Sequence, residues 1–111
     1  MKFLATVHTP MYDHNDKKYI RLVIPEKYAE FIQRKHIKEV RDNPLDGRIL
    51  TVKVPFRYRR VMCVVKGEPI QSLVTGCKVE VDVDFCGFWN IGNYSGYSWK
   101  LTQISSSSNI F

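Results

Sequence analysis

The amino-acid sequence predicts a mostly-β domain, a small barrel or sandwich of five or six strands with one or two short helices. Segments that alternate apolar and polar residues recur along the chain, most regularly from Cys77 to Phe85. Only one longer segment has a helical pattern, so the strand–helix repeat of parallel α/β proteins is missing. A chain of 111 residues suffices for one modest core. We therefore expect a single domain over residues 1–104.

The first part of the chain predicts two strands and then a helix. Lys2–His8 and Lys18–Ile24 have strand character, and the turn-rich residues 13–16 separate them. Pro25 then opens a helix that we expect from Glu26 to about Arg41. Proline is tolerated in a first helical turn because its missing N–H would have had no partner there.

The middle of the chain predicts two further strands and a connector. A turn over residues 42–47 ends the helix, and Arg48–Val54 follows as a strand with apolar residues at alternate positions. Pro55 interrupts the hydrogen-bond ladder. We expect Phe56–Val65 to be the next strand, with an exposed basic first half and a buried apolar second half. Residues 67–74 are expected to be a connector with one or two helical turns.

The last part of the chain predicts two strands joined by a long loop. In Cys77–Phe85 the valines and Phe85 occupy one face, and the charged residues occupy the other. Residues 86–96 are expected to form a loop crowded with aromatic side chains, and Tyr97–Ile104 closes the set of strands. Residues 105–111 begin with four serines and are expected to form a flexible C-terminal tail.

The net charge of +6 is concentrated in the first part of the chain. Residues 1–66 hold 15 Lys and Arg against 7 Asp and Glu, whereas residues 67–111 hold 2 against 4. This asymmetry predicts a basic face that suits an anionic partner. The weaker candidates for extending that face are Lys17, Lys18, Arg21 and the lysines and arginines of residues 27–41.

Hydropathy predicts an intracellular protein with no membrane contact. No apolar run approaches the roughly 18 residues that are needed to cross a bilayer. The apolar residues that follow Met1 give way to His8 and Thr9 before a secretory core of about 7–15 residues is complete.

The residues that could carry catalysis do not form a recognisable site, so we expect neither an enzyme nor a cofactor. The three cysteines are an odd number without a Cys-x-x-Cys pair, which disfavours a disulfide framework and a zinc knuckle. Glu80, Asp82 and Asp84 share one strand face and invite comparison with the metal ligands of a nuclease. No supporting His or Glu lies nearby in sequence, which favours a solvent-exposed face instead.

Two clusters have the chemistry of a nucleic-acid site. In the first, Phe56 and Tyr58 alternate with arginines, and Lys53 lies on the preceding strand. Guanidinium groups neutralise phosphates, while aromatic faces stack on bases. The second cluster is the aromatic loop, in which nearby glycines permit a close approach to a ligand. The predicted binding residues are Lys53, Phe56, Arg57, Tyr58, Arg59, Arg60, Trp89, Tyr94 and Tyr97. We expect Trp99 to belong to the core.

Several short motifs resemble those of the OB-fold single-stranded DNA-binding proteins of bacteria and phages. The matching pieces are Tyr58–Val61, Leu73–Gly76, Val79–Val81, Phe88–Trp89 and Trp99–Ile104, within residues 56–104. The resemblance implies an OB-like barrel that binds single-stranded DNA without sequence preference in replication or recombination. A phage or viral version fits better than a cellular one, because the chain ends in Asn109-Ile110-Phe111 where cellular members carry a long acidic tail. Val64 also occupies a position where the family often has a second aromatic residue.

Two other functions use the same residue types. A protein-interaction module would also present aromatic residues and arginines, and an RNA-binding OB domain would share the stacking chemistry. Because one small domain contacts few nucleotides, we expect a homo-oligomer, most simply a dimer. The open edge of the barrel and the apolar face of the helix are the expected contacts.

Overall fold

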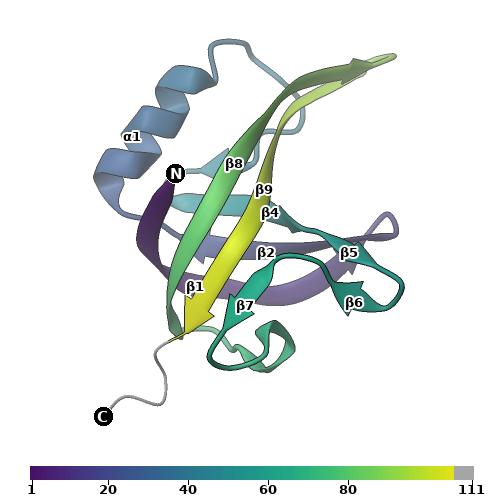
Figure 1. Cartoon of the computed structure of the whole chain (residues 1–111). Helices are drawn as coiled ribbons and strands as arrows, with labels where there is room; N and C mark the ends of the chain where they lie inside the picture. The colour runs from purple at the N-terminus through teal and green to yellow at the C-terminus, as the bar shows by residue number, and fades with distance from the viewer. Residues whose placement is uncertain (107–111) are drawn as a thin grey trace.

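The computed structural model describes residues 1–106, which form a closed ring of strands with one α-helix packed against it (Figure 1). The elements are β1 (Lys2–His14), β2 (Lys17–Val23), α1 (Glu26–Lys35), β3 (Leu45–Asp46), β4 (Ile49–Val54), β5 (Phe56–Arg57), β6 (Arg60–Val61), β7 (Val64–Lys66), the 3-10 turn η1 (Ile70–Ser72), β8 (Lys78–Ile91) and β9 (Tyr94–Ser106).

Five strands close the ring in the order β1-β2-β4-β9-β8, with β8 pairing back onto β1. All of these pairs are antiparallel except β4 with β9, which run parallel and meet where Lys53 lies beside Lys100. The fold is therefore a small OB-like, mostly-β barrel, as the sequence predicts.

The core fills the ring with the alternating apolar residues that the sequence places on single strand faces. Leu50, Val52 and Val54 of β4 are buried, as are Val79, Val81 and Val83 of β8. Helix α1 adds Ala29 and Ile32 to this core. Ala29 and Ile32 are thus used inside the domain, whereas Phe31 on the same helix is 42% exposed, and the dimer contact expected through this helix stays a prediction.

Helix α1 begins after Pro25 as predicted but ends at Lys35, earlier than the expected end at Arg41. The backbone N–H of His36 closes the last turn by donating to the carbonyl oxygens of Ile32 and Gln33. The chain beyond it runs along β9, where the backbone N–H of Lys38 donates to the Tyr97 hydroxyl and that of Asp42 donates to the carbonyl oxygen of Ser95.

The predicted strand over residues 56–65 is wrong in its details. Strand β5 turns back into β6 through Tyr58 and Arg59, both with positive φ, so these residues form a projecting hairpin. The chain returns to the barrel only at β7, which pairs with β9 beyond the point where β4 does. In the expected buried half, Val61, Cys63 and Val65 are partly buried against the core, whereas Met62 and Val64 point outward and are 56% and 51% exposed.

The predicted aromatic loop over residues 86–96 is also wrong. Strands β8 and β9 continue past the ring as a two-stranded arm that turns at Gly92 and Asn93, and this arm projects clearly in Figure 1. Ser105 and Ser106, which we expected in the flexible tail, belong to β9. The rest of that expected tail, residues 107–111, lies outside the described residues.

Two further observations bear on the sequence predictions. The three cysteines, Cys63, Cys77 and Cys86, are free thiols, and Cys86 is exposed. Within residues 1–106, no helix is long and apolar enough to span a bilayer.

Candidate nucleic-acid interface

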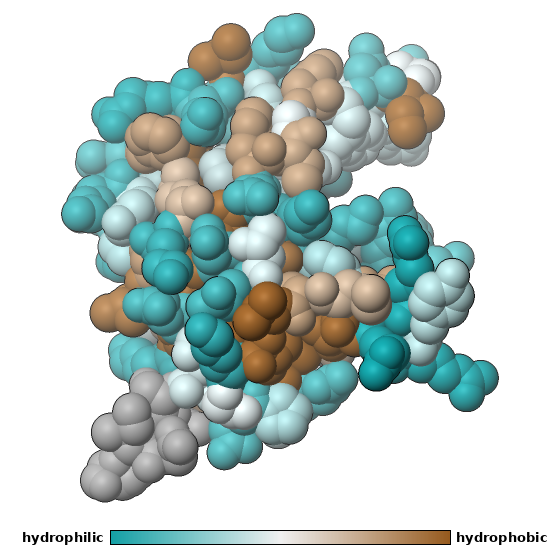
Figure 2. All heavy atoms as spheres, in the orientation of Figure 1, coloured by the Kyte–Doolittle hydropathy of each residue, from teal (hydrophilic) through white to brown (hydrophobic). Residues whose placement is uncertain are grey.

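An open groove of about 1120 Å³ lies between the tip of the β1–β2 hairpin and the β8–β9 arm, with β2 and β4 as its floor. Figure 2 shows the molecule hollowed between these two projections. The groove carries two kinds of side chain, aromatic and cationic. The aromatic residues are Tyr12, Tyr19, Trp89 and Tyr94 together with the buried Tyr97 and Trp99, and the cationic residues are Lys17, Arg21, Arg41 and Lys53.

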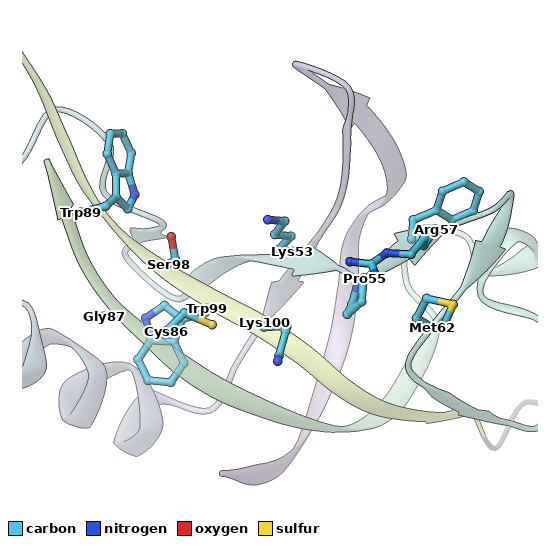
Figure 3. A pocket seen from close by; sticks show the side chains of 11 residues that line it. Lys53, Pro55, Arg57, Met62, Cys86, Gly87, Trp89, Ser98, Trp99 and Lys100 are labelled. Atoms are coloured by element: carbon cyan, nitrogen blue, oxygen red, sulfur yellow. The ribbon is translucent and has the colours of Figure 1, made fainter. Parts of the chain in front are cut away.

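A second hollow of about 570 Å³ continues from this groove toward the β5–β6 hairpin (Figure 3). Phe56, Arg57 and Lys100 line it. Both hollows share Lys53 and Trp89. The two therefore form one path, hereafter called the groove, which leads from the β1–β2 tip to the base of the β5–β6 hairpin.

A break in the β8–β9 register aims Trp89 into the groove. Phe85 pairs with Trp99, but two residues later Gly87 pairs with Ser98, so Cys86 is an extra residue in β8. Such a bulge moves the following side chains to the opposite face of a strand. Trp89 is consequently not on the face of Phe85, as strict alternation would require, but on the groove side.

The opposite wall is built by the β1–β2 hairpin. Tyr12 and Tyr19 are cross-strand partners with ring centroids 5.9 Å apart, and the ring of His14 meets Tyr19 edge-on at 6.3 Å. Burial raises the pKa of Tyr19, and the charge of nearby Asp42 raises it further. The Tyr19 ring is therefore uncharged at neutral pH and offers a flat polar-edged surface.

Positive charge in the groove is largely uncompensated. Burial lowers the pKa of Lys53, and the neighbouring charge of Lys17 lowers it further. Among the described residues, the ion pairs within 4.0 Å are those of Met1 with Asp82 and of Lys18 with Asp13, and neither lies in the groove. Asp42 is the acidic side chain in the groove wall.

Arg21 on the groove floor contributes a further unmatched donor. Its Nε is buried and makes no hydrogen bond with any part of the chain that the structure describes. A buried donor without a partner is costly, so an acceptor atom of a ligand would be favoured beside it.

His36 attaches the chain after α1 to the groove wall. Trp99 donates its indole N–H to His36 Nε2 at 3.1 Å, so the neutral ring carries its proton on Nδ1 and donates it to Asn43 Oδ1 at 3.1 Å. The His36 ring also stacks on Tyr97, with centroids 4.2 Å apart and an interplanar angle of 7°. These contacts hold the segment that carries Arg41, whose guanidinium lies 5.4 Å from the centre of the Tyr94 ring.

Tyr97 is therefore a structural residue, and its predicted role as a stacking residue needs correction. It is only 5% exposed. Its hydroxyl accepts a hydrogen bond from the backbone N–H of Lys38 at 2.7 Å and donates one to the Lys38 carbonyl at 3.3 Å. Tyr97 borders the groove, but His36 stacks on its ring and little of its surface is left exposed for a base.

The other predicted residues divide into two groups. Five of them line the groove, namely Lys53, Phe56, Arg57, Trp89 and Tyr94. Tyr58, Arg59 and Arg60 do not line it, because the β5–β6 turn carries them outward. Tyr58 is 84% exposed at the tip of that hairpin.

The sequence did not predict the aromatic wall that Tyr12 and Tyr19 form on the β1–β2 hairpin, and it indicated Lys17 and Arg21 only as weaker candidates. The available signal was the alternation of Tyr19 and Arg21 with the buried Ile20 and Leu22, which places an aromatic and a cation side by side on the outer face. Tyr12 joins them only through the pairing of β1 with β2.

Comparison with protein-family models, with curated proteins and with solved structures finds no match for this chain. Over residues 1–106, no group of three or more His, Cys, Asp and Glu side chains is placed to hold a metal ion.

Proposed function

We propose that this protein binds single-stranded DNA with little sequence preference. The observation that carries the proposal is the combination of aromatic rings and unpaired cations along one open groove. The groove also lies on the strands and loops of an OB-like barrel that suit oligonucleotides, here the β2–β4 face and the two hairpin tips.

In the proposed complex, bases stack on the groove's rings while phosphates follow its cations. Trp89 and Tyr94 supply one stacking wall, and Tyr12 and Tyr19 supply the other. Stacking is tolerant of sequence because every base has a π-face, and each stacked base contributes about 1–3 kcal/mol. Phosphate contacts release counterions, so affinity falls steeply as salt rises.

The proposed role is protection or organisation of single strands during replication or recombination. Such strands arise inside cells, which fits the intracellular location expected from the sequence. The sequence resemblance to phage and bacterial single-stranded DNA-binding proteins supports the same role, although it covers only residues 56–104.

We also propose that two copies act together, because one groove accommodates few nucleotides. A contact is available at the edge strand β7, which pairs on one side with β9 and carries the exposed Val64. Light scattering coupled to size exclusion measures this directly: a dimer mass is expected, and a monomer mass at all concentrations contradicts it.

The test of DNA binding is quenching of tryptophan fluorescence by oligo(dT), titrated at about 50 and about 200 mM salt. Strong quenching that weakens steeply with salt is expected. Trp89→Ala should remove most of the quenching, since the second tryptophan, Trp99, is buried. The matched control is Phe31→Ala, which removes a half-exposed ring on α1 outside the groove.

Other outcomes point to the other candidate functions. Equal competition by oligo(rU) would indicate that the groove accepts RNA as readily as DNA, because only the 2′-hydroxyl separates the two backbones. No quenching and no oligonucleotide retardation at low salt would overturn the proposal. The aromatic residues would then be expected to bind another protein.

A further inference from the structure

Lys53 occupies an unusual position in the groove. It lies on β4 where the two hollows meet, and it is half-buried. Figure 3 shows its side chain extended from the floor on the side of Ser98 and Trp89. A ligand that follows the groove therefore passes its terminal nitrogen.

The groups around Lys53 disfavour its ammonium form. Lys17 and Tyr19 approach from β2, Cys86 from β8 and Lys100 from β9. Burial lowers the pKa of Lys53 most, followed by the charge of Lys17, whereas Cys86 acts in the opposite direction. No carboxylate of the described chain lies within 4.0 Å of its nitrogen, and Asp42 is the acidic group elsewhere in the same groove. Desolvation and a neighbouring cation both activate a lysine as an amine nucleophile, because they favour its neutral form.

We propose that Lys53 forms a reversible imine with the aldehyde of an abasic nucleotide in a bound single strand. The inference rests on the proposed function, because DNA binding is what brings the aldehyde to the amine. It adds an activity to that function, the covalent capture of strands that have lost a base.

The chemistry needs only the two reacting groups and water. The lone pair of the neutral Lys53 amine attacks C1′ of the ring-opened sugar, and a carbon–nitrogen bond forms. Proton transfer from nitrogen to the former carbonyl oxygen gives a carbinolamine, which loses water to leave a C=N bond. Addition of water reverses both steps, so neither an oxidant nor a reductant is consumed. An abasic nucleotide also leaves free the space that its base would take beside Trp89.

The test is reductive trapping. Wild-type protein is mixed with an oligo(dT) that contains one abasic site, sodium cyanoborohydride is added, and covalent complexes are resolved on a denaturing gel. A tetrahydrofuran analogue of the abasic site, which has no aldehyde, is the substrate control. Lys53→Arg keeps the positive charge but cannot form the imine. Lys27→Arg, on the exposed side of α1, is the matched lysine control.

A trapped band is expected with wild type and Lys27→Arg, and its loss is expected in Lys53→Arg and with the analogue. Peptide mapping of the wild-type adduct should place it on Lys53, a readout that does not depend on how the variant folds. Equal trapping by Lys53→Arg, or an adduct spread over other lysines, overturns the inference.

Quenching by intact oligo(dT), measured on the same samples, separates the two proposals. Quenching without trapping overturns the imine alone, whereas absence of both overturns DNA binding as well. The neighbouring charge supplies a further check. Lys17→Gln should move the pH profile of trapping to higher pH, because removing that cation raises the pKa of Lys53. An unchanged profile would contradict the environment proposed for this amine.

Discussion

The indole of Trp89 packs directly against Gly96, its partner across the β8–β9 arm. A Cβ built on Gly96 would be 2.7 Å from Cζ2 of the indole and 2.7 Å from the backbone oxygen of Asp42. Only glycine leaves room for both neighbours, so the absent side chain at position 96 seats the ring on the arm. The indole of Trp89 is thereby in contact with the backbone of Gly96, and the ring borders the groove.

Gly96→Ala is expected to displace the indole and the segment at Asp42 together. Overpacking of this kind costs roughly 1–3 kcal/mol of unfolding free energy. Urea denaturation should show that loss, and oligo(dT) titration should show weaker quenching. Ser95→Ala is the control, because Ser95 contacts the same segment through its backbone oxygen and should change neither measurement. Wild-type stability and quenching in Gly96→Ala would contradict the packing described here.

Arg57→Gln and Arg59→Gln separate the groove from the hairpin tip. Arg57 lines the groove, whereas Arg59 does not, although the two belong to the same hairpin. Loss of one phosphate contact lowers the slope of log affinity against log salt by about 1. We expect that change for Arg57→Gln and little change for Arg59→Gln. An equal reduction of the slope in both variants would show that the hairpin tip also contacts the strand, and an unchanged slope in Arg57→Gln would contradict the phosphate contact at Arg57.

Acidification is expected to destabilise the domain through His36. Burial lowers the pKa of His36 below its ordinary value of 6.5, although its hydrogen bond with Asn43 partly opposes this. The unfolded chain therefore binds a proton on His36 more readily than the folded chain does. The stability that neutral His36 contributes is fully present above pH 6.5, and it declines as pH falls toward the lowered pKa of the folded state. Protonation also removes the acceptor that receives the Trp99 indole N–H.

Urea unfolding between pH 5 and pH 8 measures this dependence. His36→Gln is expected to be less stable at neutral pH and to show a flatter pH dependence. His8→Gln, an exposed position, serves as the control and should keep the wild-type profile. The assignment fails if His36→Gln retains the full slope.

The β5–β6 turn should accept a stabilising double substitution. Tyr58 and Arg59 have φ values of 54° and 62°, which non-glycine residues adopt at a cost. Tyr58→Asn combined with Arg59→Gly supplies the residues that this kind of hairpin turn favours. We expect a gain of about 1 kcal/mol in the free energy of unfolding, measured by urea denaturation. A loss of stability would contradict this account and show that the Tyr58 ring stabilises the folded state by packing.

Local patterns in the sequence were sufficient to predict several strands, the start of the helix and the first turn. Alternation at Leu50, Val52 and Val54 predicted a strand with one buried face, and Pro25 marked the start of the helix. The residues at the β1–β2 turn, including Asn15 and Asp16, predicted the reversal that the structure has. These features depend on neighbours close in sequence, which is why periodicity and turn chemistry can predict them.

The candidate site depended on the tertiary structure. The extra residue at Cys86 turns Trp89 toward the groove, and no periodicity in the sequence marks that bulge. Tyr97 is the residue type that stacks on bases, but the ring of His36, which is distant in the chain, stacks on it instead. By itself the sequence determined the strands, the core faces and the basic, aromatic composition. Long-range pairing decided which of those aromatic and basic side chains share a groove, because only closure of the ring brings β2, β4 and β9 together around Lys53.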